Sequence, residues 1–253
     1  MKVKGAIKLV PVVREPPEYP LLLALEASGD SVSVALVEHA CCLAFKQHNA
    51  RFGHAEHLVD LVQDVMEEAD AVFSDLTHIA AGCGPGSFTG LRVCLSAAKG
   101  YLIATKVSGL GVNGLAALAF DAITQGSTEQ RKSGALFCFS DTRRNSLFVQ
   151  EFNLQANVLT PVRDVPLEQI SSYIQEACLR FYGQPLTFIG HVTGLAELVS
   201  KDKQIFCQQR SVDAKMIARY ALQSISSPHL YPCSGFDPLY VVAPKLGPTQ
   251  RQP

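Results

Sequence analysis

The stretch AAGCGPGSFTGLRV, residues 80–93, places four glycines and one proline between an apolar run and a segment with helical spacing. A glycine-rich turn between a strand and a helix N-terminus offers backbone N–H groups and the positive end of the helix dipole, and both favour an anion such as phosphate. The stretch has no Gly-Lys-Ser/Thr of a P-loop, and Pro85 interrupts the dinucleotide-binding spacing. Two interpretations stay open: a structural turn with Ser87 or Thr89 as the helix cap, or a phosphate site formed by Gly84, Gly86, Ser87, Thr89 and Gly90.

Histidines and cysteines are the other residues that could bind a ligand. His54 and His57 lie three apart at a predicted helix start, but the H-E-x-x-H order and a third nearby ligand are missing. The eight cysteines form no C-x-x-C pair, and most lie in apolar segments, which favours reduced, buried thiols. We therefore expect no metal site and no disulfide framework.

Alternating strand and helix patterns surround the glycine stretch in the first half of the chain. Apolar runs predict strands at 21–25, 31–37, 41–45, 78–82 and 107–112. Spacings of three and four predict helices at 54–69, 90–105 and 115–122. The helix at 54–69 is amphipathic, whereas the helix at 90–105 carries few charges and must be covered on most sides.

The second half mixes strands and helices in a similar order. The segment 135–152 predicts a hairpin, followed by a helix near 167–181, a strand at 186–190 and a helix near 194–200. We expect Ser211 to cap a last helix, with one inward face made of Ala214, Ile217, Ala218 and Ala221.

Four regions are expected along the chain. They are a poorly ordered N-terminal extension at 1–20, an N-terminal lobe at 21–122, a C-terminal lobe at 123–235, and a terminal segment at 236–253 that returns toward the N-terminal lobe.

Composition excludes several classes of protein. With 47% hydrophobic and 18% charged residues, the chain has the balance of a globular protein. A formal net charge of −1 gives no electrostatic footprint for independent nucleic-acid binding. The apolar runs fall short of a membrane span, so we expect a cytoplasmic protein without membrane contact.

Taken whole, the segment Gly82–Arg92 resembles the G-x-G-P-G-S-F-T-G-x-R motif of the TsaB family, also called YeaZ. Three other segments are similar to that family in the same order: LALEASGDSVSVAL to its first hairpin, DTRRNSLFVQEF to its D-x-R-R hairpin, and DPLYVVAP to its terminal P-x-Y-x-R-x-P. The resemblance covers about residues 21 to 245 and implies a two-lobed, actin-like and Hsp70-like (ASKHA) α/β fold with mixed sheets flanked by helices.

The resemblance also implies a function. Members of this family are glycoprotease-like paralogues of TsaD, and the implied role is a non-catalytic partner and scaffold of TsaD in forming N6-threonylcarbamoyladenosine at position 37 of ANN-decoding tRNAs. The implied partners are TsaD in a heterodimer, the ATPase TsaE, a second copy of the chain when TsaD is absent, and tRNA only within the complex.

In this family two consecutive helices contact the partner, so the resemblance also points to residues here. The candidates are Leu58, Leu61, Val65, Leu91, Leu95 and Ala98, with Arg92 and Lys99 at the edge. The alternative is that about half of them pack inward on their own sheet.

Several positions depart from the relatives. The metal-binding N-H-M-x-x-H helix of TsaD aligns with VNGLAALAF, where Gly114 and Leu118 occupy the histidine positions and cannot ligate a metal. Glu26 stands where nucleotide-binding relatives have Asp, and Val242 stands where the family carries Arg. We therefore expect no catalytic residue, no metal and no tightly bound cofactor in this chain, with ATP and Mg²⁺ held only in the complex.

Alternatives to this function remain open at this stage. One is a metal-dependent glycoprotease-like peptidase, which Gly114 and Leu118 disfavour, and another is an actin-fold nucleotide-binding kinase, which Glu26 disfavours. The pair Arg143-Arg144 could contact RNA, contact the other lobe, or simply be a solvated hairpin turn.

Overall fold

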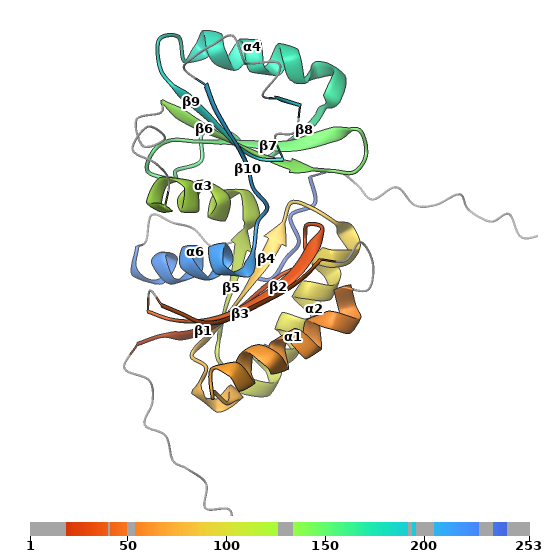
Figure 1. The fold of residues 1–253 in the computed structure, drawn as a ribbon, viewed down its shortest axis with the longest axis vertical. Helices are drawn as coiled ribbons and strands as arrows, with labels where there is room; N and C mark the ends of the chain where they lie inside the picture. Colours follow the sequence, from red (N-terminus) through yellow and green to blue (C-terminus); the bar gives the residue numbers. More distant parts are fainter. Residues whose placement is uncertain are drawn as a thin grey trace, which may run out of the picture.

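Two five-stranded mixed sheets, one in each half of the chain, form the framework of the computed structural model (Figure 1). The structure describes residues 19–39, 41–49, 54–125, 134–191, 194–195, 205–227 and 235–241. In the first sheet the order is β3-β2-β1-β4-β5, and in the second it is β10-β9-β6-β7-β8. The predicted two-lobed α/β class is confirmed.

The strands of the first sheet are β1 (Leu21–Glu26), β2 (Ser31–Glu38), β3 (Cys41–Asn49), β4 (His78–Gly84) and β5 (Ser108–Asn113). Those of the second are β6 (Ala135–Asp141), β7 (Ser146–Phe152), β8 (Arg163–Pro166), β9 (Leu186–Gly190) and β10 (Ile205–Gln209). The helices are α1 (His54–Glu68), α2 (Phe88–Thr105), α3 (Gly114–Gln125), α4 (Ile170–Arg180) and α6 (Ala214–Ser226), with short 3₁₀ turns at Phe73–Asp75 and Leu167–Gln169.

Helices and sheets alternate in layers. Helices α1 and α2 cover the outer face of the first sheet, α6 covers its inner face, and α3 lies between α6 and the second sheet, whose outer face carries α4 (Figure 1). Strand β1 is a continuous apolar run because helices cover both faces of the sheet. Leu23 and Leu25 face α1 and α2, whereas Leu22 and Ala24 face α6. A strand buried on both faces has no polar side to show.

The predicted elements agree with the structure except at a few points. The inward face of α6 is confirmed, since Ala214, Ile217, Ala218 and Ala221 are fully buried. The prediction that Ser211 caps this helix is wrong, because Asp213 is the cap and its Oδ1 accepts from the Met216 N–H at 2.9 Å. Strands β8 and β10 were not predicted, because both are short, β8 carries two charged residues and β10 ends in two glutamines.

Some predictions fall on residues that the structure leaves out. Most of the predicted helix near 194–200 lies outside the described residues, as do Val242 and residues 1–18. The described part of the terminal segment lies against the first lobe, where Phe236 packs among the outer core residues and the Leu239 N–H donates to the Cys83 carbonyl at 2.8 Å.

A buried carboxylate links the layers between the two sheets. Asp121 of α3 is fully buried and pairs with Arg219 of α6, while its Oδ2 lies 2.7 Å from Nη1 of Arg210, just after β10. One side chain therefore holds together a helix on the first sheet, a helix on the second sheet and the end of an edge strand.

The described cysteines are free thiols. Cys83, Cys94 and Cys138 are buried as expected, but Cys41 and Cys42 are exposed on the edge strand β3. Among the described helices, none is both long and apolar enough to cross a bilayer.

Candidate functional site

The four segments singled out in the sequence meet at one end of the space between the two sheets. They are the turn after β1 (27–30), the glycine turn after β4 (84–87), the turn between β6 and β7 (142–145) and the terminal segment (239–241), here called the motif cluster. The Ser87 N–H donates to the Ser28 carbonyl at 2.8 Å, and Arg143 Nη2 donates to the Gly29 carbonyl at 3.0 Å. Segments that lie far apart in the chain thus share one site.

The glycine turn packs directly on the turn after β1. A Cβ at Gly86 would lie 2.4 Å from the Ser28 carbonyl oxygen, so only glycine permits this approach. Ser87 is the helix cap, because its Oγ accepts from the Gly90 N–H at 3.3 Å, whereas Thr89 is exposed. Of the candidate phosphate ligands, Gly84 and Gly90 are buried and the Ser87 N–H is already bonded. This geometry favours an architectural turn, and phosphate binding there stays a prediction.

Glu26, at the end of β1, turns into the core beneath the glycine turn. Only 1% of it is exposed, and its Oε1 accepts from the Ser28 N–H at 2.5 Å. Its Oε2 has no hydrogen-bond partner among the described residues and occupies the space that a side chain at Gly82 would need. Burial raises the pKa of Glu26, partly opposed by the bonds from Ser28 and reinforced by the negative charge of Asp213. The Glu26 side chain is therefore part of the core and does not line a binding cavity among the described residues.

Glu26→Gln is expected to flatten the pH dependence of stability. The unfolded chain ionises Glu26 near pH 4.5, and the folded chain does so at higher pH. Below pH 4.5 both states are protonated; above it the unfolded state binds fewer protons, so Glu26 lowers stability as pH rises, by up to about 1.4 kcal/mol per pH unit. Urea unfolding between pH 5 and 8 should show that the free energy of unfolding of Glu26→Gln rises relative to that of the parent as pH rises. Glu67→Gln is the control, because Glu67 is exposed. If Glu26→Gln differs from the parent by the same amount at every pH, as the control does, the prediction is wrong.

Arg143 braces the two lobes across the motif cluster. Its guanidinium pairs with Asp30 and also donates to Gly29, while its own N–H donates to Asp141 Oδ1 at 2.8 Å. The cavity beside this brace has a volume of about 50 Å³. Small-molecule sites usually measure about 300–1,000 Å³. The described residues therefore leave no nucleotide-sized space at this point.

Two aromatic rings and two arginines form the opposite side of the motif cluster. The Phe88 and Tyr240 rings lie with centroids 5.3 Å apart, and the Arg92 guanidinium lies 3.9 Å from the centre of Phe88. Arg92 Nε also donates to the Tyr240 hydroxyl at 3.4 Å. A hollow of about 70 Å³ beside them is lined by Gly86, Ser87, Phe88, Thr142, Arg144, Phe148, Asp164, Leu239, Tyr240 and Val241.

The residues at the expected metal-ligand positions do not fit a metal. Leu118 is 1% exposed in the core between the sheets, and Gly114 begins α3 beside Val212. His57 packs on the His48 ring at 3.9 Å between centroids. Within the described ranges, no group of three His, Cys, Asp or Glu side chains could hold a metal ion.

Helices α1 and α2 place the predicted partner contacts in two environments. Leu58, Val65, Leu95 and Ala98 are buried in the core between these helices and the first sheet, and Leu91 is buried against Gly84 at the end of β4. Leu61 is half-buried, and Arg92 and Lys99 are exposed. The sequence analysis missed Ile103, which is 81% exposed, and Val59, which is 47% exposed. Helical spacing already puts Ile103 on the face of Ser96 and Lys99, away from Leu91 and Leu95.

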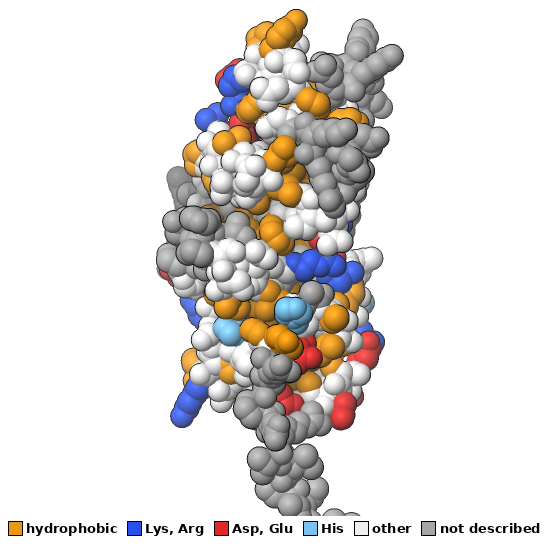
Figure 2. Space-filling model, turned by 90° about the vertical axis from the view of Figure 1, so that its left-hand side faces the viewer, with side chains coloured by type: hydrophobic (Ala, Val, Ile, Leu, Met, Phe, Trp, Pro, Cys, Tyr) orange, Lys and Arg blue, Asp and Glu red, His pale blue; other side chains and the backbone are white. Residues whose placement is uncertain are grey.

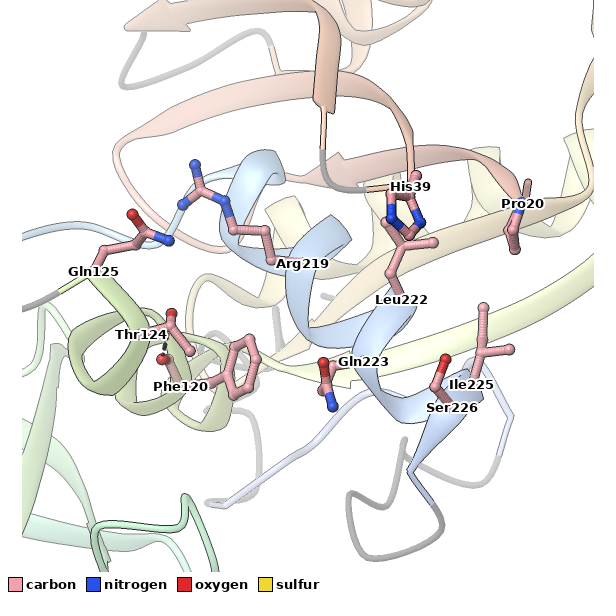
Figure 3. Close-up of a pocket in the computed structure, with 10 residues that line it drawn as sticks. All are labelled: Pro20, His39, Phe120, Thr124, Gln125, Arg219, Leu222, Gln223, Ile225 and Ser226. Atoms are coloured by element: carbon pink, nitrogen blue, oxygen red, sulfur yellow. Dashed lines mark hydrogen bonds between the residues drawn. The ribbon is translucent and has the colours of Figure 1, made fainter. Parts of the chain in front are cut away.

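A larger groove lies away from the motif cluster, between the C-terminal halves of α3 and α6. Its volume is about 340 Å³. Figure 3 shows Phe120 and Thr124 reaching it from α3, and Leu222 and Gln223 from α6. Figure 2 views this side of the molecule, where hydrophobic side chains gather beside histidine and a group of Lys and Arg. No residue of the motif cluster lines this groove.

Comparisons with known proteins agree with the motifs. The family model for TsaD, the tRNA N6-adenosine threonylcarbamoyltransferase, matches residues 48–225. The tRNA threonylcarbamoyladenosine biosynthesis protein TsaB of Escherichia coli is 26% identical over 136 residues, which is 54% of this chain and 56% of that protein. TsaB of Bacillus subtilis is 23% identical over 181 residues, 72% of this chain and 75% of that protein.

The chain spans about half the length of the first curated relatives that it matches. For TsaB from Buchnera aphidicola, for example, the match covers 44% of that protein. The structure of YeaZ from Pseudomonas aeruginosa superposes with a TM-score of 0.70 at 22% identity, covering 87% of this chain and 99% of that one. The likeness to YeaZ shows a shared fold over nearly the whole of both chains.

Proposed function

This chain belongs to the family of TsaD, the tRNA N6-adenosine threonylcarbamoyltransferase, and we propose that it serves as a non-catalytic partner of a TsaD enzyme. Its similarity to TsaB proteins supports a place in tRNA threonylcarbamoyladenosine biosynthesis. The observation that carries the proposal is in α3, where Gly114 and Leu118 stand at the positions that the resemblance assigns to metal ligands. Neither side chain has a ligating atom.

The outer face of α1 and α2 is the proposed contact with TsaD. On α2, Ser96, Lys99, Gly100 and Ile103 are exposed, and no atom lies within 4 Å of where a Gly100 side chain would begin. Glycine inside a helix costs about 1 kcal/mol relative to alanine. Since no described residue comes close enough to require glycine at position 100, a closely packed partner helix accounts for it. A lasting interface of this kind buries about 1,200–2,000 Å² in total.

Ile103→Asp is expected to weaken the heterodimer at least tenfold. An aspartate placed in a desolvated helix contact has no partner and loses its hydration. The measurement is titration of TsaD with the variant, with the mass of the complex determined by light scattering. Leu179→Asp is the matched control, because Leu179 is 75% exposed on α4 at the far side of the molecule and undergoes the same change. Equal affinities for the two variants would rule out this face.

The proposal extends to the other members of the complex and to the absence of chemistry in this chain. We expect no turnover and no tight ATP or metal binding by the chain alone, TsaE and tRNA recruited only with TsaD, and a homodimer when TsaD is absent.

The peptidase and kinase alternatives remain less favoured, the first because of Gly114 and Leu118 and the second because the cavity at the Arg143 brace is only about 50 Å³. The test is tRNA threonylcarbamoylation with and without each chain. A stoichiometric, tightly bound metal in the purified protein would contradict the proposal.

A further inference from the structure

The adjacent residues Arg143 and Arg144 have different surroundings. Arg143 is held by Asp30 and Gly29 of the other lobe. The Arg144 side chain makes no hydrogen bond or ion pair with any described residue, although its backbone N–H donates to Thr142 Oγ1 at 3.1 Å. Arg144 lines the hollow together with Gly86 and Ser87. An exposed arginine at the wall of a hollow is a ready partner for a phosphate group.

The other wall of the same hollow is aromatic. Tyr240 is 44% exposed, and Phe88 is half-buried beneath Arg92. Arg92 keeps these rings in place through its contact with Phe88 and its bond to the Tyr240 hydroxyl. Aromatic rings and arginine planes that remain accessible are the surfaces on which unpaired bases stack.

Asp164 makes a free phosphate a poor occupant. Its carboxylate lines the hollow together with Arg144, and the two form no ion pair within 4.0 Å in the described part of the chain. A carboxylate repels a bare anion but accepts hydrogen bonds from the amino groups of bases. The hollow therefore combines one partner for a phosphate, one stacking surface and one acceptor for a base edge.

We propose that the surface around this hollow binds one unpaired nucleotide of an RNA. The hollow itself, at about 70 Å³, is too small for a nucleotide, so the base lies outside it, stacked on the exposed ring of Tyr240 beside Phe88 and Arg92, and the backbone phosphate pairs with Arg144. That the RNA is a tRNA rests on the function proposed above; the chemistry of the site does not depend on it. Duplex RNA is excluded as a ligand, because its bases are stacked on each other and cannot reach an aromatic side chain.

The position of the site explains how a chain of net charge −1 can contribute to RNA binding. Arg92 lies in the first turns of α2, the same helix whose exposed face is the proposed contact with TsaD. An RNA bound at the hollow therefore lies toward the N-terminal end of that helix. This chain supplies a local contact only.

The test measures binding of a fluorescein-labelled RNA hairpin, whose loop has the sequence of an ANN-decoding tRNA, to the complex with TsaD and to the full chain alone. Tyr240→Ala is expected to weaken binding about tenfold with an unchanged salt dependence, because stacking releases no counterions. Arg144→Ala should also weaken it, and should reduce the slope of log K against log salt by about 0.7, the value for one single-strand phosphate. Tyr240→Phe, which keeps the ring, should bind like the parent.

Lys106→Asn is the matched control for charge. It removes one positive charge from the exposed end of α2, about 27 Å from the first turn, at a left-handed position that asparagine tolerates. If Arg144→Ala and Tyr240→Ala bind the hairpin no differently from Lys106→Asn, the inference is overturned. The same holds if a fully paired duplex or ATP binds with equal affinity and shows the same losses.

Failure of this inference can be told apart from failure of the proposed function. If threonylcarbamoylation requires this chain but both variants keep the parental tRNA affinity, the partner role stands and the nucleotide site does not. If the chain fails to bind TsaD but the hairpin binds and the variants show the two expected signatures, the site stands and the partner role does not.

Discussion

Asp121→Ala is expected to lower the free energy of unfolding by about 3 kcal/mol. Removing one member of a buried ion pair typically costs about 3–5 kcal/mol, because the remaining charge loses its partner. The lower end applies here, since the side chains of Arg210 and Arg219 are 27% and 37% exposed and can recover some hydration. The expected result is a clear fall in the urea midpoint with little change in the m-value.

Two companion variants sharpen this measurement. Asp121→Asn keeps an acceptor for one arginine but loses the charge, so its stability should fall between those of the parent and the alanine variant. Asp60→Ala removes an exposed carboxylate from α1 and should change stability by no more than about 0.5 kcal/mol. If Asp121→Ala lowers the free energy of unfolding no more than Asp60→Ala does, the contacts of Asp121 with the two arginines do not stabilise the packing of the layers.

Gly86→Ala is expected to cost about 2–4 kcal/mol, a large effect for one methyl group. The added Cβ would lie 2.4 Å from the Ser28 carbonyl oxygen and 2.7 Å from Ser28 Cβ, so the two turns must separate. Overpacking of this kind costs about 1–3 kcal/mol. The bond from the Ser87 N–H to the Ser28 carbonyl adds about 0.5–1.5 kcal/mol when it is lost.

The opposing turn offers the control for this prediction. Gly29→Ala makes the same change where no atom lies within 4 Å of the new Cβ, so its unfolding free energy should stay near that of the parent or rise slightly. Denaturation of both variants measures the difference. Equal stabilities would mean that the glycine turn does not need its close approach to the turn after β1.

Local sequence signals predicted the elements around the motif cluster where neighbouring residues decide the structure. Ser87 caps α2 because its Oγ accepts a hydrogen bond from the N–H three residues later. A Ser directly before a helical segment predicts this arrangement. The strands of the first sheet follow from apolar runs bounded by turn residues. The hairpin around Arg143 and Arg144 follows from two such runs, yet only the fold shows that Arg143 contacts the other lobe while Arg144 stays exposed.

Predictions failed where a distant segment decides the structure. Helix α2 is apolar on several sides, so spacing groups Ile103 with Ser96 and Lys99 but does not show which face of the helix packs on the sheet. Asp121 is the one charge of α3, but no local pattern points to its partners Arg210 and Arg219, which come almost a hundred residues later. The inner position of α6 depends equally on contacts that no local pattern reveals.

That position of α6 has a consequence for how the protein is made. The Ala214 N–H donates to Ser33 Oγ at 3.0 Å, across a sequence separation of 181 residues. During synthesis the inner apolar face of the first sheet therefore stays uncovered until α6 has left the ribosome. Closing so long a loop is slow, and uncovered strands invite aggregation. The first lobe is therefore complete only after α6, which follows the second sheet in the chain, has packed on it.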